Sequence, residues 1–294
     1  MTATMAYVWT LPRWFGAPVA WAAVALGYYV AGGTGTPFAL AMSLVSMSFL
    51  MAWAHSMNTW LDYFWTGLDR EGPGRSHSKP YTAGSQVIAN GTLSGHSVLA
   101  ASLMYLAVSL GALLAVVAVN PWVVIPWTAG ALCTFWYSWG KLHYQCELAL
   151  GMGFGPLAAL MGAAAVPDAP VLPALLAGLP IMLAFGFAAE TYDQWYDADE
   201  NIPRGLRNIG ALIYRKGWRI DGVVSVLLLL AFASHLALIA AGVFSVYTLV
   251  AFAVLPLLMA DLPKAGSKNT AVALRLLFDL FGYVILLAVG QALA

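Results

Sequence analysis

The chain has 294 residues, of which 61% are hydrophobic and 9% are charged, and its formal net charge is zero. Soluble domains contain about 25% charged residues, so this composition excludes an ordinary soluble fold and indicates an all-α integral membrane protein. A net charge of zero creates no overall field that would attract nucleic acid. We therefore expect no nucleic-acid partner and a surface that contacts membrane lipid.

A helix needs about 20 predominantly apolar residues to cross a bilayer. In chain order, such stretches lie at 14–32, 37–56, 95–118, 120–139, 148–166, 171–190, 221–242, 244–261 and 270–292. The sequence therefore predicts about nine transmembrane helices in a single domain, 1–294. The two long polar connections, 57–94 and 190–220, are expected to form cap loops over one end of the helices.

The basic residues are confined to one side of the predicted topology. All 13 Lys and Arg residues fall in the N-terminal segment, in the connections after the second, fourth, sixth and eighth spans, or at the adjoining end of the ninth span. By the positive-inside rule this side is cytoplasmic. We therefore expect a multi-pass protein of the cell (plasma) membrane whose cap loops face the cytoplasm.

A first group of oxygen-bearing side chains lies at the cytoplasmic end of the second span. Asn58 and Asp62 are four residues apart, and Asp69 follows Asp62 by seven. At this helical spacing, one face of a continuous helix could present all three. A second group lies at the end of the sixth span, where Glu190, Asp193 and Asp197 are spaced by three and then four residues.

Two acidic groups on the same side of a membrane are costly without a cation, because like charges at helical spacing repel and desolvation adds to the penalty. Hard oxygen ligands suit Mg²⁺, which takes one or two carboxylates together with substrate phosphate oxygens. We therefore expect Mg²⁺ to be held on a diphosphate by Asn58, Asp62, Asp69, Glu190, Asp193 and Asp197. The alternative interpretation is that these residues are helix ends solvated by the cytoplasm.

Basic residues follow both groups. A diphosphate carries more charge than Mg²⁺ neutralises, so nearby cations are expected to bind it and to stabilise it as it departs. Arg75, Lys79 and Arg207 are the candidates, with Asn58 as a further ligand. The competing interpretation is that such residues set the topology or contact anionic lipid.

Four polar residues outside these groups also lie in or beside the predicted spans. His143 and Glu147 are possible acid or base groups for a second substrate. His55 is expected to be as much an interhelical hydrogen bonder as a catalytic group, and Asp279 is a lone acid within the ninth span.

With these motifs in place, the chain resembles the UbiA superfamily of membrane prenyltransferases over nearly its whole length. Asn58, Asp62 and Asp69 look like the first aspartate-rich motif of that family, and Asp193 and Asp197 look like the second. The stretch from Lys79-Pro80 to Gly84 is similar to the Arg-Pro…Gly signature that follows the first motif. The resemblance implies helices around a central cavity that opens laterally to lipid.

Within the superfamily, the spacing is closest to the branch that prenylates 1,4-dihydroxy-2-naphthoate. That similarity rests on Thr66-Gly67-Leu68-Asp69 and on the run from Tyr137 through Tyr144 to Glu147. The chain departs from the family pattern at Thr59, where an Asp is usual, and at Glu190, where an Asn is usual. Arg207 is the candidate to replace the Lys that normally follows the second motif.

The resemblance implies transfer of an isoprenyl group from a polyprenyl diphosphate to an aromatic or other lipid-soluble acceptor, with Asp62, Asp193 and Arg207 as catalytic residues and Mg²⁺ as cofactor. The aromatic rings beside the two motifs could stabilise an allylic cation, namely Trp60, Tyr63, Phe64, Trp65, Tyr192, Trp195 and Tyr196. One alternative is a membrane terpene cyclase with the same diphosphate site and no external acceptor. A remote alternative is a transporter, because intramembrane acids also mark ion pathways.

Overall fold

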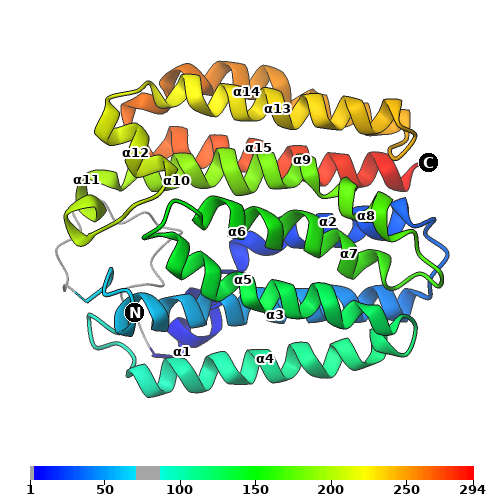
Figure 1. Cartoon of the computed structure of the whole chain (residues 1–294), viewed down its shortest axis with the longest axis horizontal. Coiled ribbons are helices and arrows are strands. Elements are labelled where there is room, and N and C mark those ends of the chain that lie inside the picture. The colour runs from blue at the N-terminus through cyan, green and yellow to red at the C-terminus, as the bar shows by residue number, and fades with distance from the viewer. Residues whose placement is uncertain (1–2, 71–86) are drawn as a thin grey trace.

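A computed structural model of the chain describes residues 3–70 and 87–294. All regular secondary structure in these two ranges is helical. The long helices lie side by side and run back and forth between two ends of the molecule (Figure 1). The expected all-α membrane fold is confirmed.

The first half of the chain forms uninterrupted helices. They are α2 (Ala17–Val30), α3 (Pro37–Phe64), α4 (Gly95–Val117) and α5 (Val124–Gly140), after a short N-terminal turn α1 (Ala3–Met5). Thr36 caps α3 because its side-chain oxygen accepts a hydrogen bond from the amide of Ala39 at 3.2 Å, as expected at a helix N-terminus.

The second half contains helices that change their winding part-way. One span, Cys146–Ala163, consists of α6 (Cys146–Met152), the π-helical segment η5 (Gly153–Leu157) and α7 (Ala158–Ala163). The next, Val171–Tyr196, consists of α8 (Val171–Ala177), α9 (Leu179–Ile181), the π-helical segment η6 (Met182–Ala189) and α10 (Glu190–Tyr196). π-Helical turns inside α-helices frequently occur at functional sites, and both of these lie beside the cavity described below.

The last spans are α13 (Ile220–Ala240), a composite helix Val246–Ser267 that includes α14 (Leu255–Asp261), and α15 (Thr270–Ala292). Two short helices, α11 (Ala198–Asn201) and α12 (Ile209–Lys216), lie between α10 and α13. They form a cap at one end of the molecule, on the left in Figure 1.

Seven helices of the described residues are long and apolar enough to cross a membrane. The other two predicted spans coincide with α2 and α5, which are 14 and 17 residues long. A multi-pass membrane protein is therefore confirmed, while the count of nine spans stays a prediction.

The predicted boundaries of the cap loops need correction. Residues 57–64 belong to the last turns of α3, and residues 190–196 form α10. These turns remain helical because most of their polar side chains are buried against other helices. Asn58, Asp62 and Glu190 are 3%, 3% and 8% exposed, so the loops begin only after Phe64 and Tyr196.

Small residues bring the central helices close together. A Cβ added at Gly27 of α2 would lie 1.8 Å from the carbonyl oxygen of Ala159, and one added at Gly162 would lie 1.8 Å from that of Val24. The backbones of α2 and α7 therefore touch, which is a common mode of helix packing where lipid removes the hydrophobic driving force.

Buried hydroxyl groups join the helices of the first half. The Ser46 hydroxyl of α3 donates to the Ser109 carbonyl of α4 at 3.0 Å, and the Trp127 indole N–H of α5 donates to the Ser109 hydroxyl at 2.9 Å. These bonds satisfy polar groups that would otherwise be costly away from water. They fix α3 and α5 relative to each other, and both helices line the cavity.

Candidate active site

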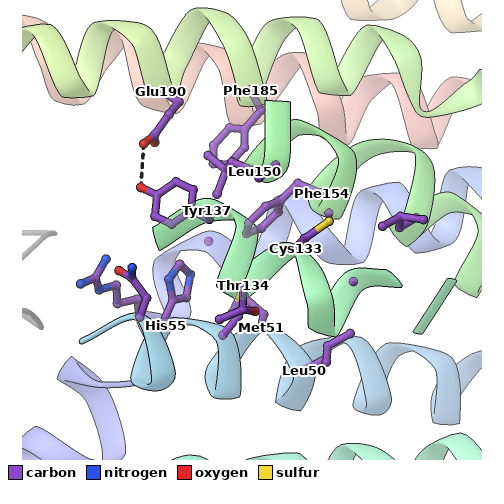
Figure 2. A pocket seen from close by; sticks show the side chains of 18 of the residues that line it. Leu50, Met51, His55, Cys133, Thr134, Tyr137, Leu150, Phe154, Phe185 and Glu190 are labelled. Carbon is purple, nitrogen blue, oxygen red and sulfur yellow. Dashed lines mark hydrogen bonds between the residues drawn. The ribbon is translucent and has the colours of Figure 1, made fainter. Parts of the chain in front are cut away.

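A cavity with a volume of about 160 Å³ lies between α3, α5, the α6–η5 helix and the η6–α10 helix. His55, Tyr137 and Glu190 lie toward one end of it, and Leu50, Cys133 and Phe154 lie further along (Figure 2). The polar end lies toward the end of the molecule that carries the cap. The remaining lining is predominantly apolar.

The last turns of α3 provide two oxygen groups that converge on one cation. The Lys141 ammonium, at the C-terminal end of α5, lies 2.5 Å from Asp62 Oδ2 and 3.4 Å from Asn58 Oδ1. The Asn58 amide donates to the Ser138 hydroxyl at 2.8 Å. Asn58 also lines the cavity, so this group stands at its polar end.

Asp69 reaches the end of α3 by a turn and not by helical spacing. The helix ends at Phe64, and Gly67 follows with φ +74°, a conformation that favours glycine. The amide of Asp69 then donates to the carbonyl of Asp62 at 3.2 Å, and Asp69 is 6% exposed. The expectation that one helical face carries all three residues is wrong for Asp69, although the turn returns it beside Asp62.

The second motif contributes Glu190 and Asp193 to the lining of the same cavity. Glu190 Oε1 accepts hydrogen bonds from the Tyr137 hydroxyl and from the Gln194 amide, both at 2.7 Å. Asp197 lies just after α10, between α10 and α11. The lining thus brings together Asn58 from the first motif and Asp193 from the second, which are 135 residues apart in the sequence.

A chain of hydrogen bonds links the Glu190 carboxylate to the cap. The Asn208 amide donates to Gln194 Oε1 at 2.9 Å, and Gln194 in turn donates to Glu190. Asn208 also caps α12, because its Oδ1 accepts from the amide of Ala211 at 2.8 Å. The position of α12 is therefore coupled to the polar end of the cavity.

Glu147 forms a second link to the cap. This carboxylate is fully buried, and its Oε1 accepts from the amide of Ile209, the first residue of α12, at 2.8 Å. His143 stacks on Trp139, with ring centroids 3.9 Å apart, and its ring is exposed. Among the described residues, the cavity lining includes neither Glu147 nor His143, so the structure gives Glu147 a role in holding the cap.

Arg207 approaches the site through its backbone. Its amide donates to the Lys141 carbonyl at 2.7 Å and its carbonyl accepts from the Tyr144 amide at 2.7 Å. Its side chain is exposed and does not line the cavity as the structure describes it. Arg75 and Lys79, the other predicted diphosphate ligands, lie outside the described residues.

An ion pair ties the cap to the segment before α15. Lys268 lies 2.9 Å from Asp199 and over the rings of Trp195 and Tyr214. Burial raises the pKa of Asp199, but the hydrogen bond and charge of Lys268 outweigh it and hold that pKa below its usual value.

Two site residues carried no signal that distinguished them in the sequence. Lys141 and Arg13 stood out only as members of the basic side, yet Lys141 contacts Asp62, and Arg13 lines the cavity from a left-handed turn with φ 51°. His55 also lines the cavity, and its buried Nε2, like Arg13 Nε, makes no hydrogen bond with any described residue. The interhelical hydrogen bond considered for this histidine nitrogen is therefore not found.

The rings that line the cavity differ from those expected. Tyr137, Phe154 and Phe185 line it, and the rings of Phe154 and Phe185 lie 5.2 Å apart. Of the seven aromatic residues expected beside the motifs, none belongs to the described lining of this cavity. Most of them contact one another, as do Trp60 and Phe64 with ring centroids 5.0 Å apart.

Comparison with solved structures gives matches over 92% or more of the chain. A digeranylgeranylglyceryl phosphate synthase is 16% identical over 100% of both chains, with a TM-score of 0.65. A UbiA homolog from Aeropyrum pernix K1 in its apo form is 19% identical over 92% of this chain and 98% of that chain, with a TM-score of 0.67. A UbiA homolog from Archaeoglobus fulgidus bound to DMAPP and Mg²⁺ is 18% identical over 94% and 99%, with a TM-score of 0.52.

The chain has the fold of the UbiA homologs. No protein-family model matches its sequence, and no curated protein matches it. At these identities, the likeness is one of fold.

The donor set at the polar end of this UbiA-type fold suits a hard cation that shares its coordination with a substrate. In the described part of the chain, no three His, Cys, Asp or Glu side chains come close enough together to hold a metal by themselves. Asn58 and Asp62 nevertheless already hold one cation, the Lys141 ammonium. Two such oxygen ligands with phosphate oxygens are typical of Mg²⁺ sites, so the residues fit the expected metal.

Proposed function

We propose that this protein is an intramembrane prenyltransferase that moves an isoprenyl group from a diphosphate to a lipid-soluble acceptor. The observation that supports it most is the cavity, which has Asn58, Glu190 and Asp193 at one end and apolar side chains along the rest. Once a divalent cation neutralises these carboxylates, such a cavity matches a molecule with an anionic head and a hydrocarbon tail. The fold likeness adds to this, since the Archaeoglobus homologs were solved with DMAPP or GPP and Mg²⁺.

In this proposal the polar end holds the diphosphate. Asn58, Asp62 and Asp193 would hold Mg²⁺, with Asp69, Glu190 and Asp197 nearby as further acidic groups. Bound Mg²⁺ would neutralise part of the diphosphate charge and polarise the leaving oxygen. Lys141 and Arg13 supply positive charge from the protein, and they stabilise the negative charge that grows as the carbon–oxygen bond breaks.

The apolar part of the cavity holds the tail. Along α3, the apolar lining runs from Met47 to Ala54, and these seven steps of about 1.5 Å span about 10 Å. An isoprene unit contributes four main-chain bonds and extends about 5 Å, because the three bonds between neighbouring Cα atoms span 3.8 Å. The enclosed length therefore suits about two isoprene units.

The side chains around the reacting end exclude water and stabilise positive charge. Tyr137 lies at the polar end of the cavity, and Phe154 lies further along, with its ring centroid 6.5 Å from that of His55 (Figure 2); aromatic faces attract cations. The cap, held by Glu147 and Asn208, limits the access of water that would quench an allylic cation. An electron-rich acceptor then attacks the cation, the attacked atom loses its proton to the diphosphate, and the protein releases the protonated diphosphate and the prenylated acceptor.

For the acceptor, we propose an aromatic molecule of the 1,4-dihydroxy-2-naphthoate type. The support is the local similarity at Thr66–Asp69 and from Tyr137 to Glu147. We also propose that the protein lies in the plasma membrane with the site at its cytoplasmic side. The described Lys and Arg residues lie before α2, in the α3–α4, α5–α6, α10–α13 and α14–α15 connections, and in the second turn of α15. These connections lie at the end of the molecule that carries the cap (Figure 1), as the positive-inside rule requires of a cytoplasmic face.

The test is a reaction of the purified protein with Mg²⁺, geranyl, farnesyl or geranylgeranyl diphosphate, and 1,4-dihydroxy-2-naphthoate. We expect a prenylated naphthoate and released diphosphate, and we expect Asp62→Asn and Asp193→Asn to remove both. Asp168→Asn is the matched control, because Asp168 is exposed in the connection between α7 and α8, at the opposite end. A cyclised hydrocarbon without added acceptor would replace this proposal with a terpene cyclase. Activity that survives both aspartate substitutions would reject the site.

A further inference from the structure

Lys141 forms a largely buried ion pair with Asp62 at the polar end of the cavity. Its ammonium contacts Asp62 at 2.5 Å and Asn58 at 3.4 Å, and it lies 4.7 Å from the centre of the Tyr137 ring. The side chains of Lys141 and Asp62 are 11% and 4% exposed. The ammonium is thus enclosed by two oxygen groups and an aromatic face.

These two oxygen groups are the ones expected to bind a divalent cation. An ammonium and a Mg²⁺ ion on the same carboxylate lie close together and repel each other, because both are cations. Lys141 in its present place therefore opposes the binding of a metal to Asp62. Without a new partner, the displaced ammonium would be left close to the metal with only the Tyr137 ring to stabilise it.

The local backbone allows this side chain to move while its anchor stays fixed. The Lys141 carbonyl accepts a hydrogen bond from the Arg207 amide at 2.7 Å, which holds the end of α5 against the cap segment. The lysine side chain itself is a flexible four-carbon stem with a charged tip. A diphosphate at the polar end of the cavity would provide the new acceptor for that tip.

We infer that Lys141 occupies the metal position on Asn58 and Asp62 in the ligand-free protein and moves to the diphosphate when metal and diphosphate bind together. Lys141 is a positioning residue in this sense, and the inference rests on the proposed function for the identity of its ligands. The ammonium opposes the binding of metal alone, but it favours the binding of metal and diphosphate together. Lys141 therefore couples the two binding events. Coupling of this kind is reciprocal and typically changes each affinity by about 5- to 150-fold.

The coupling has a functional consequence. The protein would hold little metal until a prenyl diphosphate enters, so that the charge needed for ionisation arrives only with its substrate. In the ligand-free state, the ammonium also neutralises the buried Asp62, which would be costly to leave without a counter-ion. One residue therefore serves the stability of the empty site and the order in which it fills.

The experiment measures Mg²⁺ affinity of the purified full-length protein by calorimetry, with and without methylenediphosphonate, after correction for the Mg²⁺ complex that forms in solution. For wild type we expect weak Mg²⁺ binding alone and binding tighter by at least about fivefold with the diphosphonate. For Lys141→Met we expect Mg²⁺ alone to bind more tightly than in wild type, and the gain with the diphosphonate to be smaller than in wild type, because only the direct contact between metal and diphosphonate remains. Lys264→Met is the matched control, because Lys264 also contacts an aspartate, Asp261 at 3.7 Å, but Asp261, unlike the Lys141 partner Asn58, is outside the described lining of the cavity.

A second variant protects the test from a failure to fold. Lys141→Arg keeps the positive charge on Asp62, so we expect it to retain weak binding of Mg²⁺ alone. If folded Lys141→Met binds Mg²⁺ alone as weakly as wild type, or if Lys141→Arg binds it as tightly as expected for Lys141→Met, the inference is wrong. The proposed function is judged separately by turnover: a wild type that prenylates an acceptor but shows no coupling rejects the inference alone, and one that neither binds nor consumes any prenyl diphosphate rejects the function.

Discussion

Glu147 offers a quantitative test of how the cap is held over the cavity. The change is Glu147→Ala, which removes the acceptor that receives the Ile209 amide at 2.8 Å. Glu147 is fully buried and the hydrogen bond with Ile209 is partly buried. Removing the charged acceptor of such a bond costs about 1–3 kcal/mol. Since 1.36 kcal/mol corresponds to a factor of ten, the cap should open about 5- to 150-fold more often.

The assay is hydrogen–deuterium exchange of peptides that cover α12 (Ile209–Lys216), with α4 (Gly95–Val117) as the internal control. We expect α12 amides to exchange faster in Glu147→Ala by that factor and α4 amides to be unchanged, because opening of the cap is local. Glu147→Gln keeps an acceptor oxygen in the same place and should fall between wild type and Glu147→Ala. If α12 exchanges at the wild-type rate in Glu147→Ala, Glu147 does not hold the cap.

Three further predictions concern tail length, charge in the cavity and acid stability. Gly153→Leu should favour prenyl diphosphates with shorter tails. Gly153 lines the cavity and an added Cβ meets nothing within 4 Å, so the leucine side chain would fill space that the tail uses. The binding of long tails should then cost about 1–3 kcal/mol more. The kcat/KM ratio of geranyl to geranylgeranyl diphosphate should rise at least about fivefold, and an unchanged ratio, as expected for the control Gly222→Leu on α13, would refute the tail placement. Arg13→Gln should lower kcat/KM for the diphosphate about tenfold or more, since charge-assisted hydrogen bonds contribute about 1.5–3 kcal/mol. The control is Arg219→Gln, because the Arg219 side chain is 83% exposed; an effect of Arg13→Gln no larger than that of the control would contradict the role of Arg13. Asp199→Asn should destabilise the protein by less than about 1 kcal/mol at pH 7, because the pair with Lys268 is partly exposed. The lowered pKa of Asp199 means that this contribution is complete above the unfolded value of about 3.9 and is lost as the pH falls through the folded value; a difference in thermal midpoint that persists undiminished at pH 3 would exclude the carboxylate as its source.

The spans were predictable because each is a long apolar run. The predicted stretch 270–292 coincides with α15, and 95–118 differs from α4 by one residue. The end of α3 was not predictable from composition, because residues 57–64 include polar groups that resemble a loop. They stay helical since Asn58 bonds to Ser138 and Asp62 to Lys141, which are contacts across about 80 residues of sequence.

The candidate site was predictable where residue type and spacing carry the chemistry, and not where tertiary contacts decide. The sequence indicated that Asn58 and Asp193 belong together, and both line one cavity. It contained no signal for Lys141, whose importance depends on where the end of α5 meets α3. Arg207 seemed suited to the site by its charge and position, yet its side chain is exposed and its backbone makes the contacts.

The central claim is that side chains from two distant helices act together on one metal-bound diphosphate. Electron paramagnetic resonance of Mn²⁺, used in place of Mg²⁺ with a geranyl diphosphate analogue that resists cleavage, tests it directly. We expect bound Mn²⁺ in wild type and at least about fivefold weaker binding in Asp62→Asn and in Asp193→Asn. Wild-type Mn²⁺ binding in either variant would contradict the claim that both helices hold the ligand.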